Sequence, residues 1–228
     1  MGVDVEFLRR VALFRELADE ELLSLSRMFT ERSYDRGQVV FNDDDTGRTM
    51  YVVREGRVKV SRWLPSGREV ILAFHPAADY FGEMALLDGQ TVPATVTAVV
   101  PSTILSLGRA RFNELLRQQT FSMALLRSLC ARCRDAWQQI EALSHQNAEA
   151  RIRIALHQLC MRKGTRTPTG VRIEVPLTHR ELASLSGVSR ETATRAVGHL
   201  VDEKLLLVEG RRFVVPDPER LIQTALLE

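Results

Sequence analysis

The stretch over residues 178–203 constrains the fold most, because it predicts two short helices separated by a tight turn. Thr178 and, three residues later, Glu181 form a capping-box sequence that opens the first helix. Gly187 tolerates the positive φ at which a helix ends, and Ser189 is a good N-cap for a second helix that begins at the next residue. A helix, a short Gly-containing turn and a second helix make up the helix-turn-helix unit.

The second predicted helix has two chemically different faces when its residues are placed at 100° steps. One face is apolar and must be buried: Ala193, Ala196, Val197 and Leu200. The opposite face is polar: Arg190, Glu191, Thr194 and Arg195. Arginine donates two hydrogen bonds to O6 and N7 of guanine, and glutamate accepts one from N4 of cytosine. The polar face therefore suits base edges in a DNA major groove, and an ordinary solvated helix face is the alternative interpretation.

A basic hairpin is predicted to follow these helices. Residues 205–215 have the pattern of two short strands joined at a Glu-Gly pair, with Arg211 and Arg212 at the tip, where they could meet phosphates. Residues 151–212 carry 12 Lys and Arg against 6 Asp and Glu, whereas residues 1–150 carry 18 against 20. The net charge of +2 thus conceals a basic C-terminal third, as expected of a DNA-binding wing and helix pair.

The first half of the chain has the pattern of an antiparallel barrel or jelly roll. After helical segments within residues 5–29, apolar residues alternate with a period of two and turn residues separate short runs. The predicted strands cover residues 39–41, 50–53, 58–60, 70–72, 95–98 and 103–107, and a small helix covers 109–118. Many short, regularly spaced strands are typical of antiparallel barrels and jelly rolls.

A long helix is predicted over residues 121–144, and it carries an apolar stripe. The stripe follows alternating steps of three and four, the a/d pattern of a coiled coil: Leu126, Leu129, Cys133, Ala136, Ile140 and Leu143. This pattern favours pairing with a second copy of the chain, and packing on the chain's own barrel is the alternative. Beyond it we expect a polar hinge over 145–150, a helix over 151–163, a loop over 164–170 and a strand over 171–175.

Composition narrows the compartment and the class of protein. A hydrophobic content of 45% suffices for a real core, yet no apolar run reaches the length of a signal-peptide core or a membrane helix. We therefore expect no membrane partner, and the 3 cysteines, which have no scaffold spacing, predict a cytoplasmic protein. The 5 histidines are scattered, and no nucleophile–base pairing lies near a Gly-rich turn, so we do not expect an enzyme.

Three segments resemble the cyclic-AMP receptor protein/FNR family of bacterial transcription regulators, and the resemblance covers nearly the whole chain. They are GQVVF…YVVREGRVKV in the barrel, YFGEMALLDG at residues 80–89 and SRETATR at residues 189–195. The resemblance implies an α+β fold in three parts. An N-terminal antiparallel β jelly-roll barrel of the cyclic-nucleotide-binding type covers 1–118, a dimerisation helix and hinge cover 119–147, and a C-terminal winged helix-turn-helix covers 148–228.

The last segment is similar to the recognition helix of the receptor-protein branch, which reads TGTGA half-sites. Arg190, Glu191 and Arg195 fall on its three base-reading positions, whereas the FNR branch lacks the first arginine and fits less well. With Ser189 and Thr194, and with the wing arginines, they are the predicted DNA-binding residues. The resemblance implies a homodimer that binds double-stranded DNA and has RNA polymerase as a further partner.

The predicted sensor site departs from the cyclic-nucleotide binders of this family. In those proteins the FGE glutamate takes the ribose hydroxyl, and an arginine followed by a hydroxyl residue takes the cyclic phosphate. Gly82 and Glu83 are present here, but Val92 and Pro93 stand at the arginine and hydroxyl positions. A phosphate without its cation loses a charge-assisted contact, and proline also removes a backbone donor. Cyclic AMP is therefore not the expected effector.

The purine side of this site is altered as well. Ala136 and Trp137 align with the positions on the long helix that meet adenine in the family, so the hydroxyl pair is missing. Trp137 joins Gly82 and Glu83 as a predicted effector-site residue, and Glu83 acting only to shape the barrel is the alternative. The cofactor remains unknown, and two alternatives are open. The protein binds DNA without a ligand, or it is controlled by a cyclic nucleotide, another nucleotide or haem.

Other sensor chemistries have few candidate residues. The iron–sulfur branch needs N-terminal cysteines, and no cysteine precedes Cys130. Cys130 and Cys133 are spaced CxxC within a helix, which favours small core residues over a metal or redox pair, and no metal ligand is predicted. His75 precedes the FGE segment, where a haem ligand could emerge, although a loop histidine without a role is the simpler interpretation. A nucleotide-binding regulatory subunit without a DNA role is the alternative from another class, and the polar face of residues 190–195 argues against it.

Overall fold

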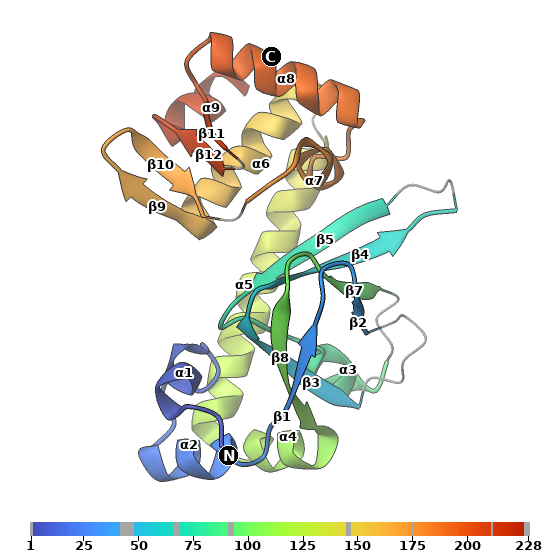
Figure 1. Cartoon of the computed structure of the whole chain (residues 1–228), viewed down its shortest axis with the longest axis vertical. Coiled ribbons are helices and arrows are strands. Elements are labelled where there is room, and N and C mark those ends of the chain that lie inside the picture. The colour runs from blue at the N-terminus through green and yellow to red at the C-terminus, as the bar shows by residue number, and fades with distance from the viewer. Residues whose placement is uncertain are drawn as a thin grey trace. The chain divides into compact units, whose positions relative to one another are not determined.

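The computed structural model describes residues 2–41, 48–65, 69–90, 94–144, 147–174, 176–210 and 212–225. The chain divides into two compact units, Met1–Cys133 and Arg134–Glu228, and the long helix α5 (Gln119–Ser144) contributes to both (Figure 1). Among the described residues, no helix combines the length and the apolar character needed to cross a membrane.

The first unit contains two four-stranded sheets whose strand pairs are all antiparallel. One sheet has the order β1 (Thr30–Tyr34), β8 (Ser102–Gly108), β3 (Thr49–Glu55) and β6 (Tyr80–Phe81). The other has the order β2 (Val39–Phe41), β7 (Thr95–Ala98), β4 (Arg57–Trp63) and β5 (Glu69–Pro76). Valines from both sheets, Val53 with Val58 and Val96, pack in one buried cluster. The predicted antiparallel barrel and its six strands are confirmed, and β1 and β6 are additional.

A second apolar core joins the helices of this unit to the first half of α5. Helices α1 (Val5–Arg10), α2 (Asp19–Ser26) and α4 (Arg109–Leu116) all contribute to it. The Phe121 ring of α5 stacks on Phe14 with centroids 6.1 Å apart and meets Phe112 edge-on at 5.8 Å. Aromatic pairs in these geometries add to the free energy of area burial. The start of α5 is therefore fixed to the barrel unit.

The second unit is a winged helix-turn-helix (Figure 1). Its helices are α6 (Ala148–Lys163), α7 (His179–Leu185), α8 (Arg190–Asp202) and α9 (Pro218–Ala225). Its sheet has the order β11 (Leu207–Glu209), β12 (Arg212–Val215), β10 (Gly170–Ile173) and β9 (Gly164–Thr167). The predicted α+β class, helix pair and hairpin wing are confirmed.

Two expectations for this unit are wrong. The predicted loop over 164–170 contains a strand, because β9 pairs antiparallel with β10 and leaves only a short turn. The predicted hinge over 145–150 is shorter, because α6 already begins at Ala148. Asn147 caps this helix by accepting a hydrogen bond from the Glu149 amide at 2.8 Å. Residues 145–146 lie outside the described part of the chain.

Ion pairs join the start of α6 to the end of α8. Arg153 donates to Glu149 at 2.6 Å and to Glu203 at 2.8 Å, while His199 Nδ1 lies 3.1 Å from both oxygens of Glu149. Burial raises the pKa of Glu149, but the hydrogen bonds of Arg153 and His199 outweigh it and hold that pKa below its ordinary value. Glu149, His199 and Glu203 are metal-ligand types whose ligand atoms lie within 4.8 Å of one another. Because Arg153 binds both carboxylates, we interpret the cluster as an ion-pair network.

The capping box that opens α7 is present in both directions. Thr178 Oγ1 accepts from the Glu181 amide at 3.2 Å, and Glu181 Oε2 accepts from the Thr178 amide at 2.7 Å. Replacing Thr178 with alanine should lower the free energy of unfolding by about 0.5–2 kcal/mol, the usual value of a lost N-cap. Urea denaturation measures this change. Thr178→Ser keeps the hydroxyl and should be nearly neutral, and an unchanged midpoint for Thr178→Ala would contradict the expectation.

Candidate DNA-binding and effector sites

Helix α8 presents the two faces expected from the sequence. Its apolar residues are buried: Ala193, Ala196, Val197 and Leu200. The four polar residues of the opposite face are exposed: Arg190, Glu191, Thr194 and Arg195. Ser189 caps the helix by accepting from the Thr192 amide at 3.1 Å. The structure thus gathers four of the predicted DNA-binding residues on one exposed face of α8, as its 3.6-residue period predicts, and places Ser189 at its N-cap.

Two of these residues are fixed by their neighbours. Hydrogen bonds from its own backbone amide and from Ser189 hold the pKa of Glu191 below its ordinary value. Thr194 Oγ1 lies 3.1 Å from Nδ1 of His179, the first residue of α7. No sequence pattern indicates the contact between Thr194 and His179, because it joins two helices across the turn.

Of the two wing arginines, the structure describes only Arg212. Arg212 is exposed on β12, and its Nη1 lies 3.5 Å from Oε2 of Glu174. Glu174 also accepts from Arg172 at 2.8 Å, and this hydrogen bond is the main reason why the pKa of Glu174 lies below its ordinary value. The charge of Arg212 is therefore partly compensated by Glu174, which follows β10. Arg211 lies outside the described residues.

The FGE segment forms a tightly built corner in the barrel unit. Gly82 has φ +86°, and a Cβ there would lie 2.7 Å from the Thr49 carbonyl oxygen, so only glycine fits. Glu83 then opens helix α3 (Glu83–Asp88) and is only 1% exposed. A carboxylate buried to this degree requires a partner.

That partner is Arg132 of α5, which is not among the predicted effector-site residues. Its Nη1 lies 2.6 Å from Glu83 Oε1, its Nη2 donates to the Tyr80 carbonyl at 2.7 Å, and its Cζ lies 4.6 Å from the centre of the Tyr80 ring. The Tyr80 hydroxyl in turn donates to Ser128. The barrel-facing side of α5 does have a sequence pattern. Its residues follow steps of four, three and four: Phe121, Leu125, Ser128 and Arg132.

Each of the two units contains a segment that matches a known protein family. Residues 31–119 match the cyclic nucleotide-binding domain, and residues 150–224 match the Crp-like helix-turn-helix domain. The cyclic AMP receptor protein of Thermus thermophilus is 34% identical over 192 residues, which cover 84% of this chain and 86% of that protein. The chain belongs to the CRP/FNR family. Members of this family are transcription regulators and not enzymes, and they bind DNA and typically dimerise.

Two further similarities, one in sequence and one in structure, extend over almost the full length of this CRP/FNR chain. The CRP-like cAMP-activated global transcriptional regulator of Mycobacterium tuberculosis is 28% identical over 221 residues, which cover 96% of this chain and 99% of that protein. The structure of a CooA mutant from Carboxydothermus hydrogenoformans has a TM-score of 0.79 at 21% identity and covers 99% of this chain and 98% of its own. At that identity the second likeness concerns the fold alone.

The apolar stripe of α5 is largely exposed in the single CRP/FNR chain. Leu126 is 54% exposed, Ile140 is 66% exposed, and Cys133 and Ala136 are exposed as well. Leu129 is partly buried against the core of the barrel unit. The Leu143 side chain lies outside the described part. Within the described part of the chain, four of the six predicted seam residues are therefore exposed, on a different side of α5 from the one that faces the barrel.

The structure places some of the other predicted sensor residues of this CRP/FNR protein, and others lie outside its described part. Trp137 is 68% exposed on α5, while Val92 and Pro93 lie outside the described residues. His75 is not in a loop: it is buried in β5, where its ring stacks on Phe81 at 5.6 Å and Nδ1 lies 3.1 Å from an oxygen of Asp79.

The cysteines correct one expectation. Cys130 and Cys133 are exposed in the single chain and are therefore not core residues of the protomer. Spacing places Cys130 and Cys133 on or near an apolar stripe of α5, but it does not show whether that stripe is covered within the protomer. Cys160 is buried, and this burial raises the pKa of its thiol to about 12, which keeps it an inert packing residue.

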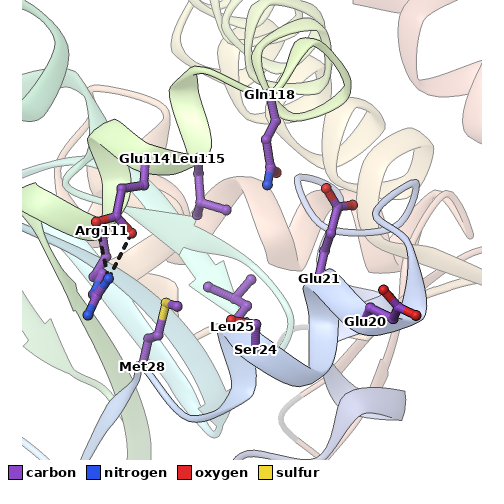
Figure 2. A pocket seen from close by; sticks show the side chains of 9 residues that line it. All are labelled: Glu20, Glu21, Ser24, Leu25, Met28, Arg111, Glu114, Leu115 and Gln118. Atoms are coloured by element: carbon purple, nitrogen blue, oxygen red, sulfur yellow. Dashed lines mark hydrogen bonds and ion pairs between the residues drawn. The ribbon is translucent and has the colours of Figure 1, made fainter.

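A cavity of about 340 Å³ lies between α2 and α4 of the barrel unit, and it does not contain the FGE segment (Figure 2). Glu20, Glu21 and Glu114 line it together with Arg111, whose guanidinium is bound by Glu114 at 2.8 Å. With its one cation already paired, this lining repels a phosphate group. We therefore do not assign the cavity to a nucleotide effector.

Proposed function

We propose that this CRP/FNR regulator is a cytoplasmic homodimer that binds palindromic DNA with TGTGA-like half-sites through helix α8. The observation that supports this most is the exposed face of α8, where Arg190, Glu191 and Arg195 offer two guanidinium forks and one ionised carboxylate. Two such helices in a two-fold dimer read half-sites one helical turn apart. RNA polymerase is the proposed protein partner, and residues 1–118, 119–147 and 148–228 are the proposed sensor, dimerisation and DNA-binding parts.

Selection from a random DNA library tests the proposal directly. The expected product is a palindrome with TGTGA-like half-sites whose centres lie about 10 base pairs apart. Binding of the selected duplex should fall steeply with salt, because each neutralised phosphate releases counterions. Failure to enrich any duplex would overturn the DNA-binding role, and enrichment of an unrelated palindrome would overturn only the base assignments.

The single variants Arg190→Ala and Arg195→Ala should each weaken binding to the selected site by about 1–3 kcal/mol and relax discrimination at one base pair. The reason is the loss of a bidentate contact that only guanine satisfies. Fluorescence anisotropy with single-base variants of the site measures both effects.

Arg211→Ala is the matched control, because a phosphate contact carries no sequence information. It should weaken binding to all duplexes alike and reduce the slope of affinity against salt. Arg212→Ala should have the smaller effect, since Glu174 already lies 3.5 Å from that guanidinium. A loss of discrimination in Arg211→Ala would contradict this division of roles.

We further propose that DNA binding does not require cyclic AMP. Val92 and Pro93 stand where a cation and a hydroxyl would hold the phosphate, and Arg132 already binds the carboxylate of Glu83. Control by another effector, such as a different nucleotide or haem, is the alternative. An absorption spectrum and a mass spectrum of the purified protein distinguish the two, because haem or a retained small molecule would appear in one of them.

A further inference from the structure

We propose that His179 is a positioning residue for Thr194, and that a proton on His179 determines which bases Thr194 prefers. This inference rests on the proposed role of α8 in reading DNA. It concerns one base pair in each half-site, the one that Thr194 faces.

The contact between these residues has a fixed geometry. His179 Nδ1 lies 3.1 Å from Thr194 Oγ1, and the His179 ring stacks on the Phe213 ring of the wing with centroids 6.4 Å apart and an angle of 14° between the planes. Phe213 is only 2% exposed, so it offers a rigid surface for the imidazole. Thr194 itself is exposed on the same face as Glu191 and Arg195. The imidazole therefore holds the hydroxyl of a residue that is placed to meet a base.

The hydrogen-bonding capacity of the two groups links base preference to protonation. A threonine hydroxyl has one proton to donate and two lone pairs, while an imidazolium can only donate from both nitrogens. When His179 is protonated, Thr194 must accept from Nδ1, so its own proton is free for thymine O4 or guanine O6 and N7.

The neutral imidazole permits the opposite arrangement. With its proton on Nε2, Nδ1 accepts the Thr194 hydroxyl proton, and the oxygen then offers only lone pairs, which suit the amino groups of adenine N6 or cytosine N4. Protonation eliminates this state. Because an imidazolium cannot accept a hydrogen bond, the preference should move toward thymine or guanine as the pH falls.

Charged and titratable side chains lie on the three elements that carry this pair and Phe213. They are Arg180 and Glu181 on α7, Arg190, Glu191, Arg195 and His199 on α8, and Arg212 on β12. Their charges, like those of the phosphates of a bound duplex, also affect the DNA affinity. A general change of affinity with pH is therefore expected from many groups, and only a change in base preference reports on the contact between His179 and Thr194.

The test is competition binding at pH 6 and pH 8 at constant ionic strength. The probes are the selected duplex and variants that carry each of the four bases at every half-site position. At one half-site position, the affinity for thymine or guanine relative to adenine or cytosine should be about fivefold higher at pH 6 than at pH 8. A ratio of this size corresponds to the net contribution of one hydrogen bond. His179→Gln cannot titrate and Thr194→Val lacks the hydroxyl, so both should lose this change. His199→Gln removes another histidine, which lies on α8 itself, and should keep the change.

The outcomes separate this inference from the function on which it rests. A wild-type protein that selects DNA but has the same base preferences at both pH values would overturn the inference alone. So would a full pH response in His179→Gln or Thr194→Val, with folding of each variant verified by circular dichroism. A wild-type protein that selects no DNA overturns the proposed function and this inference with it.

Discussion

Replacing Ile140 with glutamate should convert the protein to a monomer at micromolar concentration and abolish tight DNA binding. Ile140 is 66% exposed in the single chain, and it continues the stripe of Leu126 and Cys133 at seven-residue intervals. In a paired helix the new carboxylate would lie unpaired against its symmetry mate, at a cost of roughly 3–5 kcal/mol, or about 10²- to 10⁴-fold in the dissociation constant. A monomer holds only one half-site. Sedimentation and anisotropy measure the two effects.

Ala131→Glu is the matched control for this variant. Ala131 is exposed on the same helix but lies at the outermost position of the heptad frame, so its glutamate remains in water. It should leave both the dimer and the DNA affinity unchanged. A dimeric Ile140→Glu protein, or a wild-type chain that sediments as a monomer, would contradict pairing through this stripe.

The fold was largely predictable because its signals are local. The periods of two and 3.6 residues identify the strands and the helices, and the capping box at Thr178 identifies the start of α7. The strand Gly164–Thr167 was missed because Pro168 and Gly170 make the whole segment look like a loop. Its pairing with β10 depends on a partner strand that no local pattern reveals.

The sites were predictable only where they lie on one element. The exposed face of α8 follows from helical periodicity, and Gly82 and Glu83 follow from a motif. The partner of Glu83 was missed because Arg132 lies 49 residues away, and its role depends on which side of α5 packs on the barrel. The contact of His179 with Thr194 joins two helices for the same reason. Sequence spacing orders residues within an element, whereas packing decides which elements meet.

Cyclic AMP should bind weakly or not at all, and DNA binding should be the same with and without it. Val92 cannot pair with a phosphate, and Pro93 has neither a hydroxyl nor a backbone N–H to donate. Losing a buried charge-paired contact costs about 2–5 kcal/mol, or roughly 30- to several-thousand-fold in affinity. A ribose hydroxyl would also have to share Glu83 with Arg132, whose guanidinium lies 2.6 Å from its Oε1. Calorimetry and anisotropy, each with and without cyclic AMP, are the measurements, and micromolar affinity or cyclic-AMP-dependent DNA binding would contradict both expectations.

Restoring the phosphate contact provides the converse experiment. In the double variant Val92→Arg with Pro93→Ser, cyclic AMP should gain measurable affinity, because a cation and a hydroxyl return to the positions that hold the phosphate in the family. Val92→Lys with Pro93→Ala is the matched control, since it restores the charge without the bidentate fork or the hydroxyl and should gain less. By its alignment with an adenine-contacting position, Trp137 should limit the gain, so adding Trp137→Ser to the double variant should increase affinity further. If the triple variant still fails to bind in calorimetry, the missing phosphate contacts are not what excludes cyclic AMP, and the ion pair of Glu83 with Arg132 becomes the group to vary next.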